Sequence, residues 1–332
     1  MKHLILLSII VLSFCSCVQE IHCDFADYNV APCGYSLQKI GTITTTNASL
    51  KFQMIDKNIG YAHSFAASNI ELFKTEDGGK TWNNWNVSFN HHPFRMSFVN
   101  KNQGYIAQRG DTLQASMMIT SDGGLTWTER EYPEYEFFTF LLKDQNENIY
   151  SCTRQGKFIK SSDQGLTWEN IISVYPSPSS YITSIVDDQI FFSGFGKDIF
   201  IFDLDGNILK KIIVQKIDDF QQMKIIDSMN IVLSYNRSTI KTSDGGESWS
   251  DIYDKETTII DFPSPEVGLM VMNDNYCDIY QATVIGLTND GGQTWMKSEE
   301  MEDFKSQYKS AQKVGDNHYL LLVGTDIYEL KR

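Results

Sequence analysis

Short apolar runs separated by polar turns follow one another along most of the chain. A run such as Leu50–Ile55 or Phe94–Val99 is followed, after a few polar residues, by a second run that begins near Gly60 or Gly104. Runs of this length, bounded by Gly, Asn and Asp, are typical of β-strands joined by tight turns. The pattern therefore predicts an all-β protein built from many short strands.

A nine-residue motif occurs five times in this pattern and ends each time in tryptophan. The copies end at Trp82, Trp127, Trp168, Trp249 and Trp295. Successive copies are 45, 41, 81 and 46 residues apart, so the long step spans two repeats. The degraded copy lies in Ile199–Leu209, where a turn around Asp205 and Gly206 remains without the tryptophan. A period in the low forties with one turn motif per unit indicates a β-propeller.

The core of the motif, an aspartate followed by glycine between two strands, predicts a hairpin turn. Glycine adopts positive φ without strain, and the carboxylate can accept backbone N–H groups that the turn leaves unpaired. The tryptophan is expected to fold back over the turn and fill the edge of the blade. An acid repeated in every unit suits a structural role, which we expect for Asp77, Asp122, Asp163, Asp244 and Asp290.

These residues resemble the bacterial neuraminidase repeat, or Asp-box, with the pattern Ser-x-Asp-x-Gly-x-Thr-Trp. The first and last copies carry Glu76 and Asn289 at the serine position. The resemblance covers nearly the whole mature chain. Asp-boxes occur in sialidases, xyloglucanase-like glycosidases, sortilin-type receptors and propellers similar to the photosystem II assembly factor. The resemblance implies an architecture, and the function has to be inferred from the site.

Seven four-stranded units, with strands A to D, fit this spacing. The A strands are expected at Leu50–Ile55, Phe94–Val99, Phe137–Leu142, Tyr181–Val186, Met223–Ile226, Thr258–Phe262 and Ser310–Val314. The last unit lacks a fourth strand, which the segment Tyr35–Thr45 is expected to supply, closing the ring. Residues 35–332 would then form one seven-bladed propeller, with the boxes in the C–D turns of one face. Binding loops are expected on the opposite face, formed by the D–A and B–C connections.

The N-terminus has the pattern of a bacterial lipoprotein signal. Lys2 and His3 precede the apolar run Leu4–Phe14, and Cys17 follows a small Ser16. We expect residues 1–16 to be removed, Cys17 to be lipidated, and residues 17–34 to form a tether at the bacterial cell envelope. Cys23 and Cys33 are close enough in sequence to form a disulfide in that compartment.

Charge and cysteine spacing exclude several classes of function. The formal net charge is −14, which argues against nucleic acid as a partner. No CxxC pair supports a metal site, and nothing in the chain calls for a cofactor. We expect a monomer whose contact with the membrane is its lipid anchor.

Two groups of side chains are candidates for binding on the face opposite the boxes. Arginine binds carboxylates bidentately, which suits an acidic ligand or partner, although salt bridges within so acidic a protein would explain the same residues. The arginines expected at that end are Arg95, Arg109, Arg130 (ending its strand D), Arg154 and Arg237. Aromatic rings there would suit sugar stacking or a peptide anchor, although fewer than half are expected to be exposed. The main aromatic candidates are Trp85, Tyr132, Tyr135, Tyr175 and Tyr276.

Catalysis has weaker support than binding. Phe94-Arg95-Met96 resembles part of the sialidase motif Phe-Arg-Ile-Pro, but it lacks the proline and follows the first box instead of preceding it. No spacing singles out an acid pair among the candidate carboxylates Glu134, Glu136, Asp274 and Asp303. The sequence favours a non-catalytic envelope scaffold that binds a protein, most similar to the photosystem II assembly factor group. A glycan-binding lipoprotein and a sialidase-like or other glycoside hydrolase are the alternatives.

Overall fold

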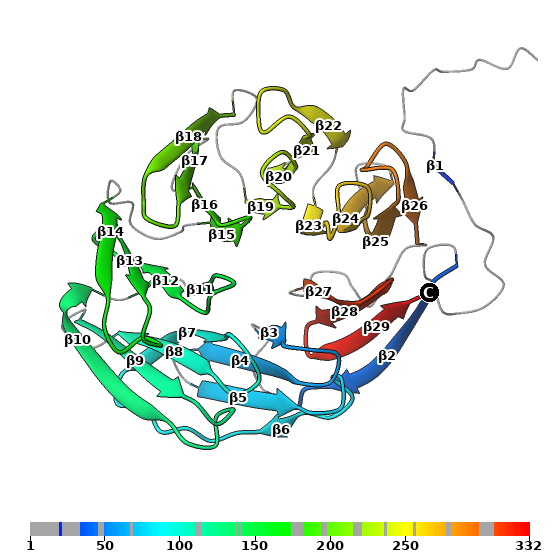
Figure 1. The fold of residues 1–332 in the computed structure, drawn as a ribbon. Helices are drawn as coiled ribbons and strands as arrows, with labels where there is room; N and C mark the ends of the chain where they lie inside the picture. The colour runs from blue at the N-terminus through cyan, green and yellow to red at the C-terminus, as the bar shows by residue number, and fades with distance from the viewer. Residues whose placement is uncertain are drawn as a thin grey trace, which may run out of the picture.

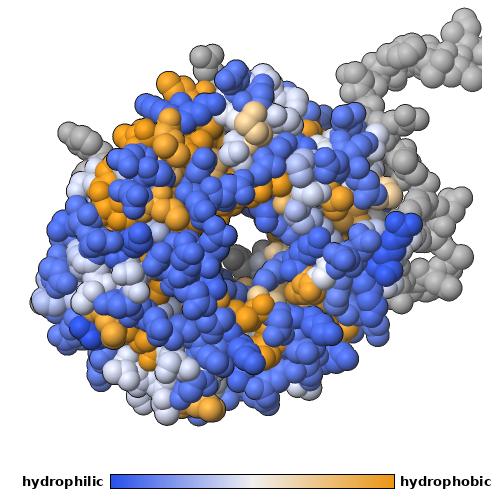
Figure 2. Space-filling model, viewed as in Figure 1, coloured by the Kyte–Doolittle hydropathy of each residue, from blue (hydrophilic) through white to orange (hydrophobic). Residues whose placement is uncertain are grey.

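Seven sheets form a ring in the computed structural model (Figure 1), and the space-filling view shows a central opening, the channel (Figure 2). Six of the sheets have four strands and the seventh has five. No helix in the described part of the chain is long and apolar enough to cross a membrane. The structure describes residues 20–21, 34–45, 50–66, 69–109, 114–136, 138–139, 141–173, 182–193, 198–214, 221–235, 238–254, 257–276, 280–298 and 309–332.

Each sheet is one blade, and its strands follow one another in chain order from the channel to the outer rim. Blade 1 consists of β3 (Lys51–Met54), β4 (Gly60–Ala66), β5 (Asn69–Thr75) and β6 (Asn83–Asn84). Blade 2 consists of β7 (His92–Phe98), β8 (Gly104–Arg109), β9 (Gln114–Thr120) and β10 (Thr128–Glu136). Blade 3 consists of β11 (Leu142–Lys143), β12 (Ile149–Cys152), β13 (Lys157–Ser161) and β14 (Glu169–Ser173). Blade 4 consists of β15 (Ile182–Val186), β16 (Gln189–Ser193), β17 (Asp198–Asp203) and β18 (Ile208–Ile213).

The remaining blades follow the same plan with two additions from the N-terminal side of the chain. Blade 5 consists of β19 (Gln222–Ile225), β20 (Ile231–Tyr235), β21 (Ser238–Thr242) and β22 (Ser250–Tyr253). Blade 6 consists of β23 (Thr257–Asp261), β24 (Gly268–Tyr276), β25 (Tyr280–Thr288) and β26 (Trp295–Lys297), and β1 (Glu20–Ile21) pairs parallel with β26. Blade 7 consists of β27 (Lys309–Gly315), β28 (His318–Val323), β29 (Asp326–Lys331) and β2 (Ser36–Thr42). The expected seven-bladed propeller is confirmed.

The ring closes through β2, as the unpaired N-terminal segment predicted. This strand runs antiparallel to β29, from Ser36 opposite Lys331 to Thr42 opposite Asp326. Gly41 lies directly on the first Asp-box, where an added Cβ would be only 2.3 Å from the Gly79 carbonyl oxygen. The closing strand therefore joins blade 7 to blade 1 at a point that only glycine fits.

Hydrogen bonds explain the residues of the Asp-box. In blade 1 the Thr81 N–H and hydroxyl donate to the two oxygens of Asp77, at 2.9 and 2.6 Å. The Thr75 hydroxyl donates to Asp77 at 2.9 Å and accepts the Gly79 N–H at 2.9 Å. Thr or Ser has the role of Thr75 in the other boxes. The serine of the pattern therefore corresponds to Thr75 and its equivalents, two residues before the aspartate, and its assignment to Glu76 and Asn289 is wrong. The aspartate of each intact box accepts the corresponding hydrogen bonds within its own turn.

The degraded copy in blade 4 keeps the same turn with different chemistry. The Asn207 N–H and side-chain amide both donate to Asp203, each at 2.8 Å, as threonine does in the intact boxes. Gly206 has φ of 87°, close to that of the second glycine of the boxes. The turn therefore keeps the carboxylate and a glycine at positive φ, but it lacks both the tryptophan and the hydroxyl two residues before the aspartate, where Ile201 stands.

Candidate functional site

Strand direction decides which residues share a face with the boxes. Strands A and C run toward the box end of each blade, so the D–A and B–C connections lie at the other end. Arg109 ends β8, and Arg154 lies in the turn between β12 and β13, so both are at the end away from the boxes. Arg95 lies in the middle of β7, the innermost strand of blade 2.

Arg95 belongs to a basic cluster, formed with Lys51 and His63, that the sequence analysis did not identify. Lys51 pairs with His63 across β3 and β4. Lys51 and Arg95 hold equivalent positions in their blades. The A–B turn is closed by a hydrogen bond from Ile55 N–H to Ile59 O in blade 1 and from Val99 N–H to Gln103 O in blade 2. Each cation lies four residues before the donor of that bond. The cluster therefore lies on the innermost strands of two neighbouring blades. Both cations are exposed, and His63 is only 9% exposed.

The electrostatics of the cluster favour an anion. Burial, Lys51 and Arg95 together lower the pKa of His63 to about 3, so the imidazole is neutral at neutral pH. Lys51 is exposed as a residue, but partial desolvation of its ammonium and the Arg95 charge lower the pKa of Lys51. In the described part of the chain, no carboxylate lies within ion-pair distance of the Lys51 ammonium. A bound carboxylate would relieve the repulsion between these groups.

Glutamine side chains fix the spacing of the inner strands. The amide of Gln53 donates to the Phe98 carbonyl at 2.8 Å and accepts the Phe98 N–H at 2.9 Å, which joins blade 1 to blade 2 beside the cluster. Gln312 makes the same pair of bonds to Met54 of blade 1, each at 2.7 Å. Gln222 likewise bridges to blade 6. The two Gln53 bonds tie β3, which carries Lys51, to β7, which carries Arg95.

The other predicted arginines are dispersed. Arg130 was expected to end strand D, but it is the third residue of β10 and lies opposite Met117, on the outer strand and nearer the box end. The strand continues to Glu136 because the segment after Arg130 pairs with β9 up to Gln114. The Arg154 guanidinium lies 3.8 Å from the Glu136 carboxylate, an ion pair of the kind that the salt-bridge alternative describes. Arg237 lies outside the described residues.

The described aromatic candidates pack against boxes instead of surrounding the channel mouth. The Trp85 indole donates to the Gly124 carbonyl at 2.8 Å, in the box of blade 2. It occupies the space that a side chain at Gly124 would need. The placement of Trp85 on the face opposite the boxes is therefore wrong, because the outer strand of one blade leans on the box of the next.

The two tyrosines on β10 have the same role. The buried Tyr132 hydroxyl donates to the Gly165 carbonyl, and the Tyr135 hydroxyl donates to the Trp168 carbonyl at 3.2 Å, both in the box of blade 3. Neither ring is available to a ligand. Tyr175 and the side chain of Tyr276 lie outside the described residues.

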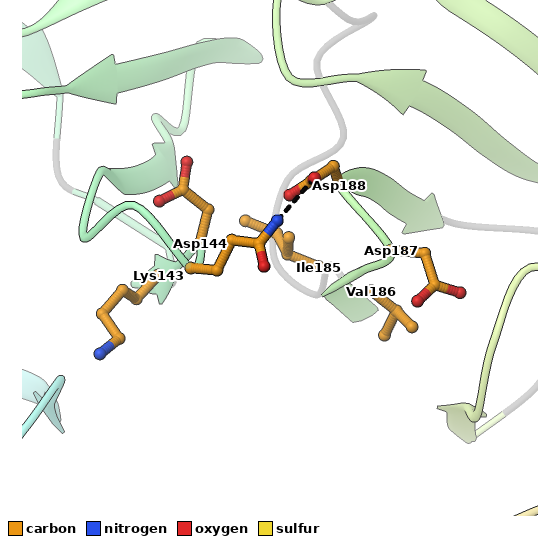
Figure 3. Close-up of a pocket in the computed structure, with 7 residues that line it drawn as sticks. Lys143, Asp144, Ile185, Val186, Asp187 and Asp188 are labelled. Atoms are coloured by element: carbon orange, nitrogen blue, oxygen red, sulfur yellow. Dashed lines mark hydrogen bonds between the residues drawn. The ribbon is translucent and has the colours of Figure 1, made fainter.

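A separate pocket lies at the box end, between the A–B turns of blades 3 and 4 (Figure 3). Its volume is about 400 Å³, and its lining includes Asp144, Asp187 and Asp188. Gln145 reaches across it and donates to Asp188 at 2.7 Å. Three carboxylates make this pocket unsuitable for an acidic ligand.

The described residues contain little that suggests catalysis. Among them no group of three or more His, Cys, Asp or Glu side chains could hold a metal ion. Burial raises the pKa of the Cys152 thiol to about 12, so it is not a nucleophile at neutral pH. Glu134 and Glu136 are both on β10, whereas Asp303 and the side chain of Asp274 lie outside the described residues. Cys17, Cys23 and Cys33 also lie outside them.

Comparison with known proteins supports the fold. No protein-family model matches the sequence, and no curated protein matches it either. The chain is similar in structure to YCF48 bound to D1 peptide, with a TM-score of 0.69 and 16% identity, covering 92% of this chain and 98% of that chain. It is also similar to a streptogramin B lyase, with a TM-score of 0.64 and 10% identity, covering 90% and 97%. A third neighbour is the GH74 xyloglucanase from Xanthomonas campestris, with a TM-score of 0.59 and 12% identity, covering 89% of this chain and 53% of that chain.

These neighbours include a peptide-bound propeller, a lyase and a glycosidase. At such identities they show the shared propeller fold, and the similarity to the photosystem II assembly factor propeller that the Asp-boxes implied is confirmed at that level. The function has to be inferred from the basic cluster.

Proposed function

We propose that the chain is a non-catalytic scaffold of the cell envelope that binds an acidic segment of a partner protein at Lys51 and Arg95. The observation that carries this proposal is the basic cluster itself, in which two cations lie on the innermost strands of neighbouring blades in a protein of net charge −14. A neighbour of the same fold is bound to a peptide, which supports a protein partner in general. The lipoprotein pattern ending at Cys17 supports an anchored location in the envelope.

The geometry favours a carboxylate over other ligands. The planar guanidinium of Arg95 has the geometry that matches a carboxylate, Lys51 adds a second charge, and the neutral His63 lies beside them. The glutamine bonds hold the strands in place, so little ordering is needed when the ligand binds. The glycan-binding alternative loses support, because Trp85, Tyr132 and Tyr135 are used in packing between blades.

The test uses two labelled peptides that differ only in charge, one rich in Asp and Glu and the other with Asn and Gln in their place. We expect fluorescence anisotropy to show that the acidic peptide binds, and we expect its affinity to fall as salt is added. The double variant Lys51→Ala and Arg95→Ala should lose at least about tenfold in affinity, since each charged hydrogen bond contributes about 1.5–3 kcal/mol. The matched control is Arg130→Ala, which removes an exposed arginine from the outer strand and should change affinity less than about twofold.

Equal affinity for the two peptides would exclude recognition of carboxylates. An equal loss in the double variant and in Arg130→Ala would show that general charge, and not the cluster, attracts the peptide. Intact thermal unfolding of each variant is needed for either reading.

A further inference from the structure

The outer strand of blade 4, β18, is unusual among the blades. It forms one edge of the sheet β15–β16–β17–β18, and it lies at the outer rim in Figure 1. It pairs with β17 on one side, and no other described strand pairs with its outer edge. An edge strand presents unpaired N–H and C=O groups that can bond to another strand.

This edge is also apolar. Ile208, Leu209 and Ile213 are 60%, 52% and 53% exposed, which makes them three of the seven large hydrophobic residues exposed in the described part of the chain. Figure 2 shows hydrophobic surface at the upper left, the part of the rim where Figure 1 places β17 and β18. Apolar side chains gathered at one edge mark an interaction site more often than isolated ones do.

A shifted bulge explains why these side chains are uncovered. In blades 3 and 5 the residue left unopposed by the bulge, Ile171 or Ile252, packs on a glycine in the C–D turn of the next blade, Gly206 or Gly292. In blade 4 the unopposed residue is Leu209, whereas Ile212 makes the contact with the next box. Leu209 therefore has no place between the blades and points to solvent.

The charge of β18 indicates what could cover it. The outer strands β10, β14 and β22 each carry carboxylates, whereas β18, like β2, β6 and β26, carries none. Among these outer strands only β18 has two adjacent lysines, Lys210 and Lys211, at its centre. The Lys210 ammonium donates to the Gly245 carbonyl at 2.9 Å, and Lys211 pairs with Asp198 at 2.8 Å. A second copy paired antiparallel about the strand centre would set Lys210 against Lys211, which is unfavourable. An acidic strand would place opposite charges there.

We propose that β18 accepts an extended acidic and apolar segment of a partner protein as a fifth strand of blade 4. The backbone of the segment would bond to the outer edge, with carboxylates near Lys210 and Lys211 and apolar side chains on Ile208, Leu209 and Ile213. Blade 6 has a fifth strand of this kind, because β1 adds to β26. This surface is on a different blade from the basic cluster and does not depend on it.

The experiment measures hydrogen exchange of the amides of residues 208–213 with synthetic peptides. One probe alternates Glu and Val over eight residues, and the second has Lys in place of Glu. We expect the acidic peptide to slow exchange in β18 at least fivefold at saturation, and the basic peptide to have no effect. The double variant Ile208→Glu and Ile213→Glu should need at least a tenfold higher peptide concentration for the same protection. The substitutions are at exposed positions, so thermal unfolding should be unchanged.

Two controls separate this surface from others. Leu125→Glu changes an 82% exposed residue in the box turn of blade 2 and should bind as the parent does. Lys51→Ala with Arg95→Ala should leave protection of β18 unchanged, which separates this proposal from the proposed function.

Three results would overturn the proposal. Equal protection by the basic peptide would mean that the contact is apolar only. Protection that rises with protein concentration without peptide would assign the edge to a second copy. Protection by anionic vesicles, but not by the acidic peptide, would assign it to a membrane surface.

Discussion

Burial of His63 should make the stability of the propeller fall as the pH drops below neutrality. Burial, Lys51 and Arg95 lower the pKa of His63 from 6.5 to about 3 in the folded protein. Below pH 6.5 His63 binds a proton in the unfolded chain, whereas in the folded protein it stays neutral until the pH nears 3. The lowered pKa therefore removes stability as pH falls through this window. One proton changes the free energy of unfolding by about 1.4 kcal/mol per pH unit, so the loss between pH 6.5 and 5 is about 2 kcal/mol.

Urea denaturation at pH 7 and pH 5 tests this. His63→Gln removes the titrating group, so we expect its loss between the two pH values to be smaller than that of the parent by about 2 kcal/mol. His92→Gln, which changes an exposed histidine at the start of β7, should keep the loss of the parent. If His63→Gln loses as much stability as the parent, His63 is not held neutral in the folded protein, and the electrostatic account of the basic cluster is incorrect.

Two further predictions concern the packing between blades. Gly41→Ala places a Cβ against the Gly79 carbonyl and should destabilise the closed ring by about 1–3 kcal/mol. Gly315→Ala should not destabilise it, because the added Cβ would meet nothing nearer than 3.6 Å. Thermal unfolding of both variants checks this. Trp295→Phe removes an indole donor shared by two carbonyls and should lower the free energy of unfolding more than Trp249→Phe does. The reason is that the buried indole nitrogen of Trp249 has no partner among the described residues. Urea denaturation of the two variants measures the difference.

The fold could be predicted because the information that specifies it is local. The turn needs a carboxylate, a hydroxyl four residues later and a glycine at positive φ, and all of them lie within one short segment. In blade 2, hydrogen bonds from Thr126 and Thr120 lower the pKa of Asp122 to about 2, so the box works with an ionised acid. The residue directly before the aspartate is exposed in every intact box, which is why Glu76 and Asn289 are tolerated there. Repetition of such a segment at a constant period is enough to count blades.

The site could not be predicted in the same way because it depends on contacts between blades. Trp85 follows the first box in sequence, but its indole belongs to the box of blade 2, 39 residues later. Sequence position gives no sign that an outer strand leans on the next blade. The sequence therefore places Trp85, Tyr132 and Tyr135 at the channel mouth, whereas in the structure their rings pack between the sheets.

The basic cluster nevertheless left a signal in the repeat. Lys51 and Arg95 lie one period apart, at the same place in consecutive A strands, and each is the second residue of its predicted strand. In a ring of blades, residues one period apart are neighbours around the channel, so two cations in that relation lie close in space even though they are distant in sequence. Arg130 has no cationic equivalent one period away in the outer strand of blade 3, where Glu169–Ser173 has no lysine or arginine. Comparing the same position in successive repeats therefore separates Arg95 from Arg130, which counting arginines on a face did not.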